Sequence, residues 1–188
     1  MDKKELIREA AIKVMSKEGF YSTKMQIIAN EAGVAIGTIY LYFKNKEDIL
    51  DYIFMIEYKK RLNFLDHLKE SNMSYVKKIE SFLFFHVNEL KGSPDIAKIL
   101  IQESVCPLLH KLEWINKTFN GIPDAFKWML ENAKLNGEVR DIDTDIIGTS
   151  IFLSSRALAY KLQVEGRENE YDYAMDQFVS FIFNGIKK

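Results

Sequence analysis

Side chains able to bind phosphate groups or base edges are concentrated between residues 19 and 46 of this 188-residue chain. Here Ala29, Gly33 and Ile39 are four and six residues apart. In a helix-turn-helix, a small residue lets the second helix approach, a glycine adopts the left-handed turn, and a branched apolar residue anchors the second helix. Such a short, protruding helix can enter the major groove of DNA. The spacing therefore predicts DNA binding, with a compact helix pair of no binding function as the alternative.

Polar side chains lie at the far end of this expected corner. They are Tyr40, Tyr42, Lys44 and Lys46. Phenol hydroxyls and ammonium groups donate hydrogen bonds to phosphate oxygens, and such contacts fix the register of a protein on DNA without reading its sequence. These side chains are therefore candidates for contacts to the DNA backbone.

The elements that must position these side chains are all expected to be helices. Apolar periodicity predicts two N-terminal helices that end near Gly19 and Ala32, with Thr23 and Gln26 forming a capping box for the second. Pro123 either kinks one long helix or begins a new one, and a new start or sharp bend is the favoured interpretation. Further helices are expected at about residues 36–43, 46–68, 73–90, 143–165 and 168–186. No alternating β-type pattern occurs, so the predicted fold class is all-α.

The composition fits a soluble globular protein with a basic N-terminal part. Hydrophobic residues make up 47% of the chain and charged residues 28%, and the formal net charge is −1. Residues 1–46 hold eight Lys or Arg against five Asp or Glu, a net +3, while the remainder holds 18 against 22, a net −4. This asymmetry fits a DNA-binding head on an acidic body, although the overall charge gives no case for nucleic acid.

The same composition indicates the compartment. Cys106 is the single cysteine, which excludes an internal disulfide, and we expect it to be a buried structural thiol in a reducing cytoplasm. No run approaches the ~18 apolar residues required to cross a bilayer. The charged N-terminus is unlike a signal peptide. We therefore expect a cytoplasmic protein that does not associate with a membrane.

The run from Ala32 to Leu50, preceded by Thr23 and by Ile28-Ala29, closely resembles the N-terminal domain of the tetracycline-repressor (TetR) family. The resemblance implies an all-helical, dimeric bacterial transcription regulator, usually a repressor that a small ligand releases from DNA. It covers about a quarter of the chain, and the remainder is similar only in length and helical texture. We expect a helix-turn-helix domain over residues 1–46 and a helical ligand-binding and dimerisation domain over residues 47–188. A helix from about residue 46 to 68 would connect them, in a fold of about nine helices.

By this resemblance, the N-terminal part of the second motif helix would insert into the major groove. Ile36, Gly37 and Thr38 would approach base edges, and Gln26 in the preceding helix can also reach a base. Family members often carry Lys or Arg in place of Ile36 and serine in place of Ala35, so Ile36 offers only an apolar contact, for example to a thymine methyl group. The alternatives are that Gln26 only completes the capping box and that Ile36 is a core residue.

The resemblance also implies contacts to the phosphates. Tyr40, Tyr42 and Lys46 would hydrogen-bond phosphate oxygens, with Tyr42 at the margin of the groove, and Lys24 could reach the DNA backbone. Tyr40 could alternatively pack its ring against the protein while its hydroxyl stays in water. Phosphate contacts weaken as salt rises and are shared by every DNA sequence.

The last two expected helices are the best candidates for a homodimer interface. A single recognition helix buries too little to be selective, so such domains usually bind palindromes as two-fold dimers. Small residues in the first helix allow close approach, and the second has more apolar circumference than one contact requires. These residues are Gly148, Ser150, Ser154, Ser155, Ala157 and Ala159, then Tyr171, Ala174, Met175, Phe178, Phe181, Ile182 and Phe183. Two copies would form a four-helix bundle, unless both faces serve the interior of one chain.

The body is rich in aromatic residues, which together with Met can line an apolar cavity for a small molecule. The candidates are Phe82, Phe85, His86, Phe126, Met129, Phe152 and Arg156, with core packing as the alternative for each. Arg156 lies in a largely apolar segment and needs a partner, either a neighbouring acid or an anionic ligand. The run from Gly37 to Leu50 resembles acyl-CoA-responsive regulators of fatty-acid metabolism. An acyl-CoA or another lipophilic compound is therefore the expected effector.

No pattern indicates an enzyme, a metal site or a cofactor. The chain has no Gly-rich phosphate loop, His-Glu-x-x-His motif or nucleophile elbow. The spacing of His67, His86 and His110 does not suggest metal binding. The alternatives to a ligand-responsive repressor are a DNA-binding protein without an effector and an enzyme whose catalytic residues are dispersed. The large aromatic body favours the repressor.

Overall fold

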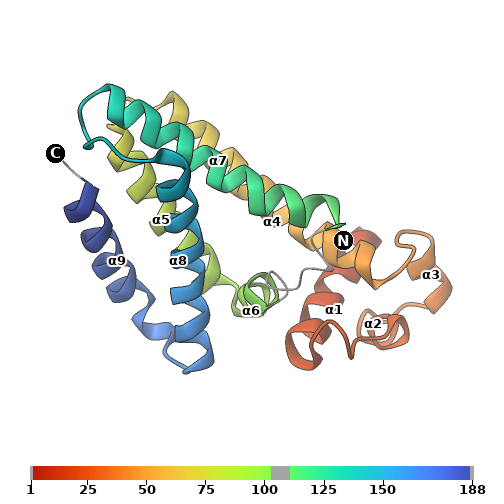
Figure 1. Ribbon diagram of the computed structural model, residues 1–188. Helices are drawn as coiled ribbons and strands as arrows, with labels where there is room; N and C mark the ends of the chain where they lie inside the picture. Colours follow the sequence, from red (N-terminus) through yellow and green to blue (C-terminus); the bar gives the residue numbers. More distant parts are fainter. Residues whose placement is uncertain (1, 103–110, 187–188) are drawn as a thin grey trace. The chain divides into compact units, whose positions relative to one another are not determined.

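The computed structural model describes residues 2–102 and 111–186. The elements of the described residues are nine α-helices and one short 3₁₀ helix (Figure 1). In chain order they are α1 (Lys3–Glu18), α2 (Met25–Glu31), α3 (Ile36–Tyr40), α4 (Lys46–Glu70), α5 (Tyr75–Gly92), α6 (Pro94–Gln102), α7 (Glu113–Leu135), α8 (Thr144–Val164), the 3₁₀ helix (Glu168–Glu170) and α9 (Tyr171–Ile186). The predicted all-α class is confirmed.

The chain divides into two compact units. The first contains residues 1–58 and 93–116, and the second contains residues 59–92 and 117–188. α4 and α7 each begin in the first unit and continue into the second. α6 belongs to the first unit, where it packs on α1. The first unit is larger than the expected DNA-binding domain of residues 1–46, because it also includes the start of α4, α6 and the start of α7. The functional boundary at residue 46 stays a prediction.

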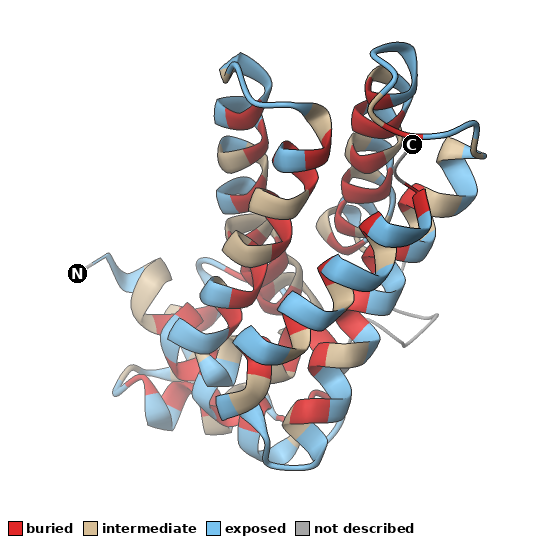
Figure 2. Cartoon of the chain, turned by 90° about the vertical axis from the view of Figure 1, so that its left-hand side faces the viewer, coloured by how far each residue is buried: buried red, intermediate tan, exposed pale blue. Residues whose placement is uncertain are grey.

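The helix-turn-helix forms around a small apolar core in the first unit. Asp2 caps α1 by accepting a hydrogen bond from the backbone N–H of Lys4 at 3.2 Å. Ala29 and Ile39 are completely buried, and Gly33 has a φ of 63°, the left-handed conformation that favours glycine. Figure 2 shows how buried and exposed residues alternate around the helices, as expected for helices with one face in a core. The predicted corner is confirmed.

The start of α2 differs from the predicted capping box. Lys24 is the residue that precedes α2, and its side chain makes no capping hydrogen bond among the described residues. The Thr23 hydroxyl instead donates to the carbonyl oxygen of Gly19 at 2.8 Å. Gln26 donates from Nε2 to Oδ1 of Asn30 at 3.0 Å. The capping-box prediction is wrong because both side chains find other partners close by.

Pro123 lies inside α7, which continues from Glu113 to Leu135. The interpretation of Pro123 as the start of a new helix is therefore wrong. Proline removes one backbone donor and crowds the preceding turn, which disfavours a helix interior. Ile122 and Phe126 on either side are both buried, and the packing of these side chains offsets the local cost.

The second unit contains the C-terminal half of α4 together with α5, most of α7, α8 and α9. Glu138, in the turn after α7, accepts hydrogen bonds from the backbone N–H of Tyr75 at 3.2 Å and of Val76 at 2.9 Å. This carboxylate caps the first turn of α5. A Cβ added at Gly148 would lie 3.0 Å from the backbone nitrogen of Lys127, so the absence of a side chain at Gly148 lets α8 approach α7.

None of the helices in the described part of the chain is long and apolar enough to span a bilayer. Within the same residues, no three His, Cys, Asp or Glu side chains come together as a metal-binding group. Cys106 and His110 lie outside the described residues, and so does the predicted burial of the Cys106 thiol.

Candidate functional site

Helix α3 has one buried side, which packs in the first unit, and one exposed side. Ile39 is completely buried and anchors the helix. Gly37 is exposed, and Thr38 is half-buried one residue further along. Ile36 is also half-buried, so it can still make an apolar contact to a base or serve mainly as a packing residue. The structure thus places the three predicted base-reading positions on the first turn of an anchored helix.

Three large, exposed side chains lie at the C-terminal end of α3 and in the two residues after it. Tyr40 is 55% exposed, Leu41 82% and Tyr42 40%, while the next residue, Phe43, is buried. The Phe43 ring lies 5.5 Å from that of Tyr52 in α4, which fixes the end of this segment. Both tyrosines can therefore present their hydroxyls to a phosphate. Leu41 was not among the predicted contacts, because an apolar side chain cannot donate a hydrogen bond to a phosphate; α3 ends at Tyr40, earlier than the expected residue 43.

Lys46 makes contacts different from those expected. Its Nζ donates hydrogen bonds to the backbone carbonyl oxygens of Phe20 at 2.8 Å, Tyr21 at 2.9 Å and Thr23 at 3.1 Å. An ammonium group has three N–H donors, so all three are used by the loop between α1 and α2. Nζ also lies 4.6 Å from the centre of the Phe20 ring, a cation–π contact.

These contacts give Lys46 a structural role in addition to the predicted one. A phosphate would have to compete with these carbonyl oxygens for the N–H groups of Lys46. We therefore infer that Lys46 positions the loop before α2 against α4, while its phosphate contact stays a prediction. No pattern in the sequence could have indicated this, because the partners lie 23 to 26 residues earlier in the chain.

The remaining candidates lie around α2. Lys24 is exposed at the start of the helix, where its side chain can reach a phosphate. Gln26 is exposed as well, and its bond to Asn30 uses only the amide nitrogen. The Oε1 atom of Gln26 can still accept a hydrogen bond from a base, so the predicted contact stays open.

The second unit brings several of the predicted effector residues together in its interior. Phe82, Phe126, Met129 and Phe152 are buried, and the rings of Phe82 and Phe126 lie 5.4 Å apart at nearly right angles. Phe85 is only half-buried. Its ring stacks on that of Phe64 at 4.0 Å beside a surface groove of about 440 Å³.

His86 has a buried partner, Arg61, on another helix. Nε of Arg61, in α4, donates a hydrogen bond to Nδ1 of His86 at 3.0 Å. An acceptor Nδ1 carries no proton, so the imidazole is neutral and its proton lies on Nε2. Burial lowers the pKa of His86 well below its usual value of 6.5, and the charges of Arg61 and Arg156 lower it further. Arg61 lies 25 residues before His86 on another helix, so no local pattern indicated the pair.

Arg156 lies among aromatic rings of the same unit. Its guanidinium carbon is 4.9 Å from the centre of the Phe119 ring and 5.3 Å from that of Phe152. Burial, together with the charge of Arg61, lowers the pKa of Arg156 to about 10, so Arg156 is still charged at neutral pH. The interior of the second unit therefore combines aromatic surface with the cationic side chains of Arg61 and Arg156.

Helices α8 and α9 expose an apolar surface in addition to the face that each buries. Tyr171, Met175 and Phe183 of α9 are buried, whereas Phe181 is 78% exposed. An apolar groove of about 250 Å³ runs between the helices, lined among others by Ile147, Ser150, Ser154, Phe178, Phe181 and Ile182. Gly148, Ser155 and Ala159, predicted to allow approach of a second copy, are buried within this chain instead.

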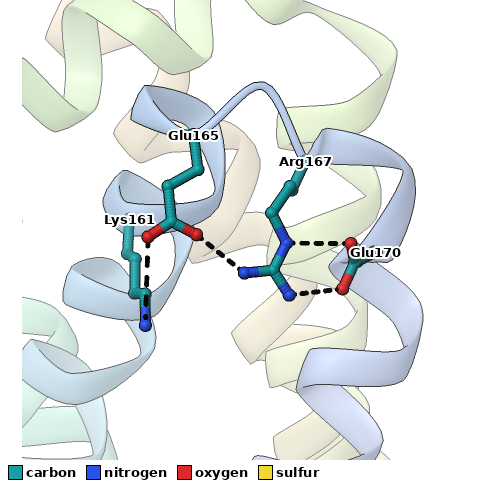
Figure 3. Close-up of polar contacts among 4 residues, drawn as sticks. All are labelled: Lys161, Glu165, Arg167 and Glu170. Carbon is teal, nitrogen blue, oxygen red and sulfur yellow. Dashed lines mark hydrogen bonds and ion pairs between the residues drawn. The ribbon is translucent and has the colours of Figure 1, made fainter.

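A network of charged side chains holds the turn between α8 and α9 (Figure 3). Arg167 donates to Glu170 through Nε at 2.8 Å and Nη2 at 2.6 Å, and to Glu165 through Nη1 at 2.7 Å. Lys161 lies 4.0 Å from the same Glu165 carboxylate. These acids raise the pKa of Arg167 above its usual value, with Glu170 the larger contributor. The network stabilises the turn that connects α8 to α9.

A helix-turn-helix with a protruding, anchored second helix, followed by a helical body, defines the class of helix-turn-helix DNA-binding regulators. Residues 7–53 match the family described as bacterial regulatory proteins, tetR family. A fatty acid metabolism regulator protein of Bacillus subtilis (strain 168) is 30% identical over 150 residues, covering 78% of this chain and 76% of the relative. The chain therefore belongs to the tetR family, and it is a helix-turn-helix transcriptional regulator, not an enzyme.

Other relatives agree with this assignment. An uncharacterized HTH-type transcriptional regulator of B. subtilis, YhgD, is 29% identical over 146 residues, covering 78% of this chain and 76% of the relative. The solved structure of the transcriptional regulator FadR from B. subtilis in complex with stearoyl-CoA superposes with a TM-score of 0.81 at 24% identity, covering 94% of this chain and 97% of FadR. A Clostridium perfringens putative fatty acid metabolism regulator gives a TM-score of 0.84 at 22% identity, covering 97% and 99%. At these identities the structures show a shared fold.

Proposed function

We propose that this regulator represses transcription by binding a palindromic operator as a homodimer and that a long-chain acyl-CoA releases it. The observation that carries the proposal is the geometry of α3, in which Ile39 is completely buried while Gly37 and Tyr40 are exposed. This arrangement fixes the helix and leaves its first turn open to the major groove. Gly37, Thr38 and Ile36 would contact base edges, together with Gln26. Tyr40, Tyr42 and Lys24 would contact phosphates.

The exposed apolar surface of α8 and α9 supports the dimer. Leu153, Tyr160 and Phe181 are large side chains that are 45% exposed or more in the single chain. Together with the apolar groove between the two helices, these exposed residues support a protein–protein interface. A second copy packing on this surface would form a four-helix bundle, and the two-fold axis would pair two copies of α3 with the two halves of a palindrome.

The interior of the second unit supports an acyl-type effector. An acyl chain would replace part of the ring–ring contact between Phe82 and Phe126, with Met129 as an adaptable neighbour. Arg156 and His86 lie in the same interior and could bind polar groups of the ligand. Similarity to a fatty acid metabolism regulator and to a FadR structure with stearoyl-CoA adds to this proposal. Because these rings are packed in the described structure, ligand entry would favour a different arrangement of the body.

A fluorescence anisotropy titration tests the proposal. Labelled DNA from upstream of the gene is titrated with the protein, then with oleoyl-CoA, free CoA or oleate. We expect nanomolar binding that unrelated DNA of equal length does not show, and release by oleoyl-CoA but not by free CoA. Binding without release by any acyl compound would instead support a regulator without an acyl effector. Equal affinity for both DNA fragments would refute the operator.

A further inference from the structure

Helix α7 is capped by a side chain from another helix. Asp51, in the second turn of α4, accepts hydrogen bonds through Oδ1 from the backbone N–H of Trp114 at 2.8 Å and of Ile115 at 3.3 Å. These amides lie in the first turn of α7, where N–H groups have no partner within the helix. The preceding residue, Leu112, has no side-chain acceptor. Asp51 therefore does what a capping residue usually does from its own helix.

The two hydrogen bonds from α7 affect the pKa of the Asp51 carboxylate. Burial raises the pKa of Asp51, and the neighbouring charges of Glu113 and Asp48 raise it as well. The two hydrogen bonds from the first turn of α7 lower it. The two amides thus favour the charged form at a half-buried position, which ties α4 to α7 through a charge-assisted contact.

The same stretch of α4 is bonded to the DNA-binding motif. Lys46, five residues before Asp51, donates to three carbonyl oxygens of the loop that leads into α2. The rings of Tyr58 and Trp114, 6.2 Å apart, add a second contact between α4 and α7. All of these contacts lie within the first compact unit. Residues 46–51 therefore connect the loop before α2 to the first turn of α7.

Helix α7 also reaches the interior of the second unit. It runs without interruption from Glu113 to Leu135, and it carries the buried Phe126 and Met129. A shift or tilt of α7 caused by a ligand beside these residues would move its first turn as well, because a helix transmits displacement along its axis. Asp51 holds this first turn through its two hydrogen bonds to the backbone of α7.

We propose that Asp51 is the positioning residue that couples the effector-binding body to the DNA-binding head. Movement of α7 acts on α4 through the Asp51 carboxylate, and α4 moves the loop before α2 through Lys46. The part that concerns the effector rests on the proposed function above. The competing view is that Asp51 only stabilises the end of α7.

Two variants and a matched control separate these views. Asp51→Ala removes the acceptor, whereas Asp51→Asn keeps an Oδ1 that can accept both hydrogen bonds. Glu138→Ala removes a carboxylate that caps α5 in the same way. Among the described contacts the side chain of Glu138 has no hydrogen bond to α4 or α7, and its backbone bond to Ala133 of α7 is kept in the variant. In wild type we expect oleoyl-CoA to raise the operator dissociation constant about tenfold or more. We expect Asp51→Asn and Glu138→Ala to keep this ratio and Asp51→Ala to reduce it to less than about twofold.

A second readout needs no effector. Coupling is reciprocal, so operator binding should change hydrogen–deuterium exchange at the first turn of α7 in the wild type and leave it unchanged in Asp51→Ala. A wild type that binds no operator would overturn the proposed function. A wild type that binds operator but is not released by oleoyl-CoA would refute the acyl effector only. The coupling role is refuted if Asp51→Ala responds like the wild type in exchange, or in release where release occurs.

Discussion

Replacing Lys46 by methionine separates the role that the structure gives this residue from the role that the family resemblance implies. In the structure, Nζ bonds to the carbonyl oxygens of Phe20, Tyr21 and Thr23 at 2.8, 2.9 and 3.1 Å. Methionine keeps most of the aliphatic length and removes the donors. The variant should therefore weaken the fold of the motif without removing a contact to DNA.

The magnitude follows from the number of bonds. A hydrogen bond contributes about 0.5–1.5 kcal/mol net, and Lys46 is half-buried, so values near the lower end of that range apply to each of its bonds. Three such bonds and the loss of the cation–π contact with Phe20 give about 2 kcal/mol of lost unfolding free energy. Urea unfolding followed by circular dichroism would measure this loss.

The salt dependence of operator binding provides the decisive comparison. The slope of log K against log salt falls by about 0.9 for each phosphate contact that is lost, hence by about 2 for a dimer that loses two. We expect Lys46→Met to leave this slope unchanged. Lys24→Met, which removes an exposed side chain proposed to contact phosphate, should lower the slope by about 2 and leave stability unchanged. Unchanged stability with a lowered slope in Lys46→Met would show that Lys46 contacts phosphate and that its bonds to the loop before α2 do not stabilise the motif.

Three further changes test other parts of the account. Thr38→Val removes a hydroxyl while keeping the shape, so it should change discrimination between operator variants by about 1–3 kcal/mol in competitive titrations, and equal losses on all sequences would contradict a base contact. Phe181→Asp places a charge on an apolar surface, so sedimentation at micromolar concentration should show monomers, whereas Leu135→Asp at a site that is also exposed (83%) should stay dimeric. The folded-state pKa of His86 is lowered, so the unfolded chain binds the extra proton below pH about 6.5 and the unfolding free energy should fall there by up to about 1.4 kcal/mol per pH unit. His86→Gln should remove this part of the slope, and equal slopes would contradict a buried neutral imidazole.

The sequence was sufficient to predict features that depend on neighbouring residues. The corner at Gly33 follows from glycine's access to positive φ and from the apolar residues at helical spacing around it, and the structure confirms it. The apolar character of α9 on more than one face follows from its composition in the same way. The fold class is the sum of such local signals.

Features that depend on distant residues could not be predicted. Lys46 matches a phosphate-binding position by resemblance, yet its Nζ donates hydrogen bonds to carbonyl oxygens that lie 23 to 26 residues earlier in the chain. Arg61 and His86 meet only when α4 and α5 pack together. Pro123 stays within a helix because packing on either side outweighs its local preference. In the first two cases the deciding partner lies far along the chain, and for Pro123 the deciding factor is the burial of Ile122 and Phe126, which only the folded structure shows.

Hydroxyl-radical footprinting of the upstream DNA with the wild-type protein tests the central claim most directly. Two copies of α3 reading the two halves of a palindrome should protect two patches related by two-fold symmetry and about one helical turn, or a multiple of it, apart. Oleoyl-CoA should remove both patches together. A single patch, or even protection along any DNA, would contradict the dimeric operator reader proposed for this protein.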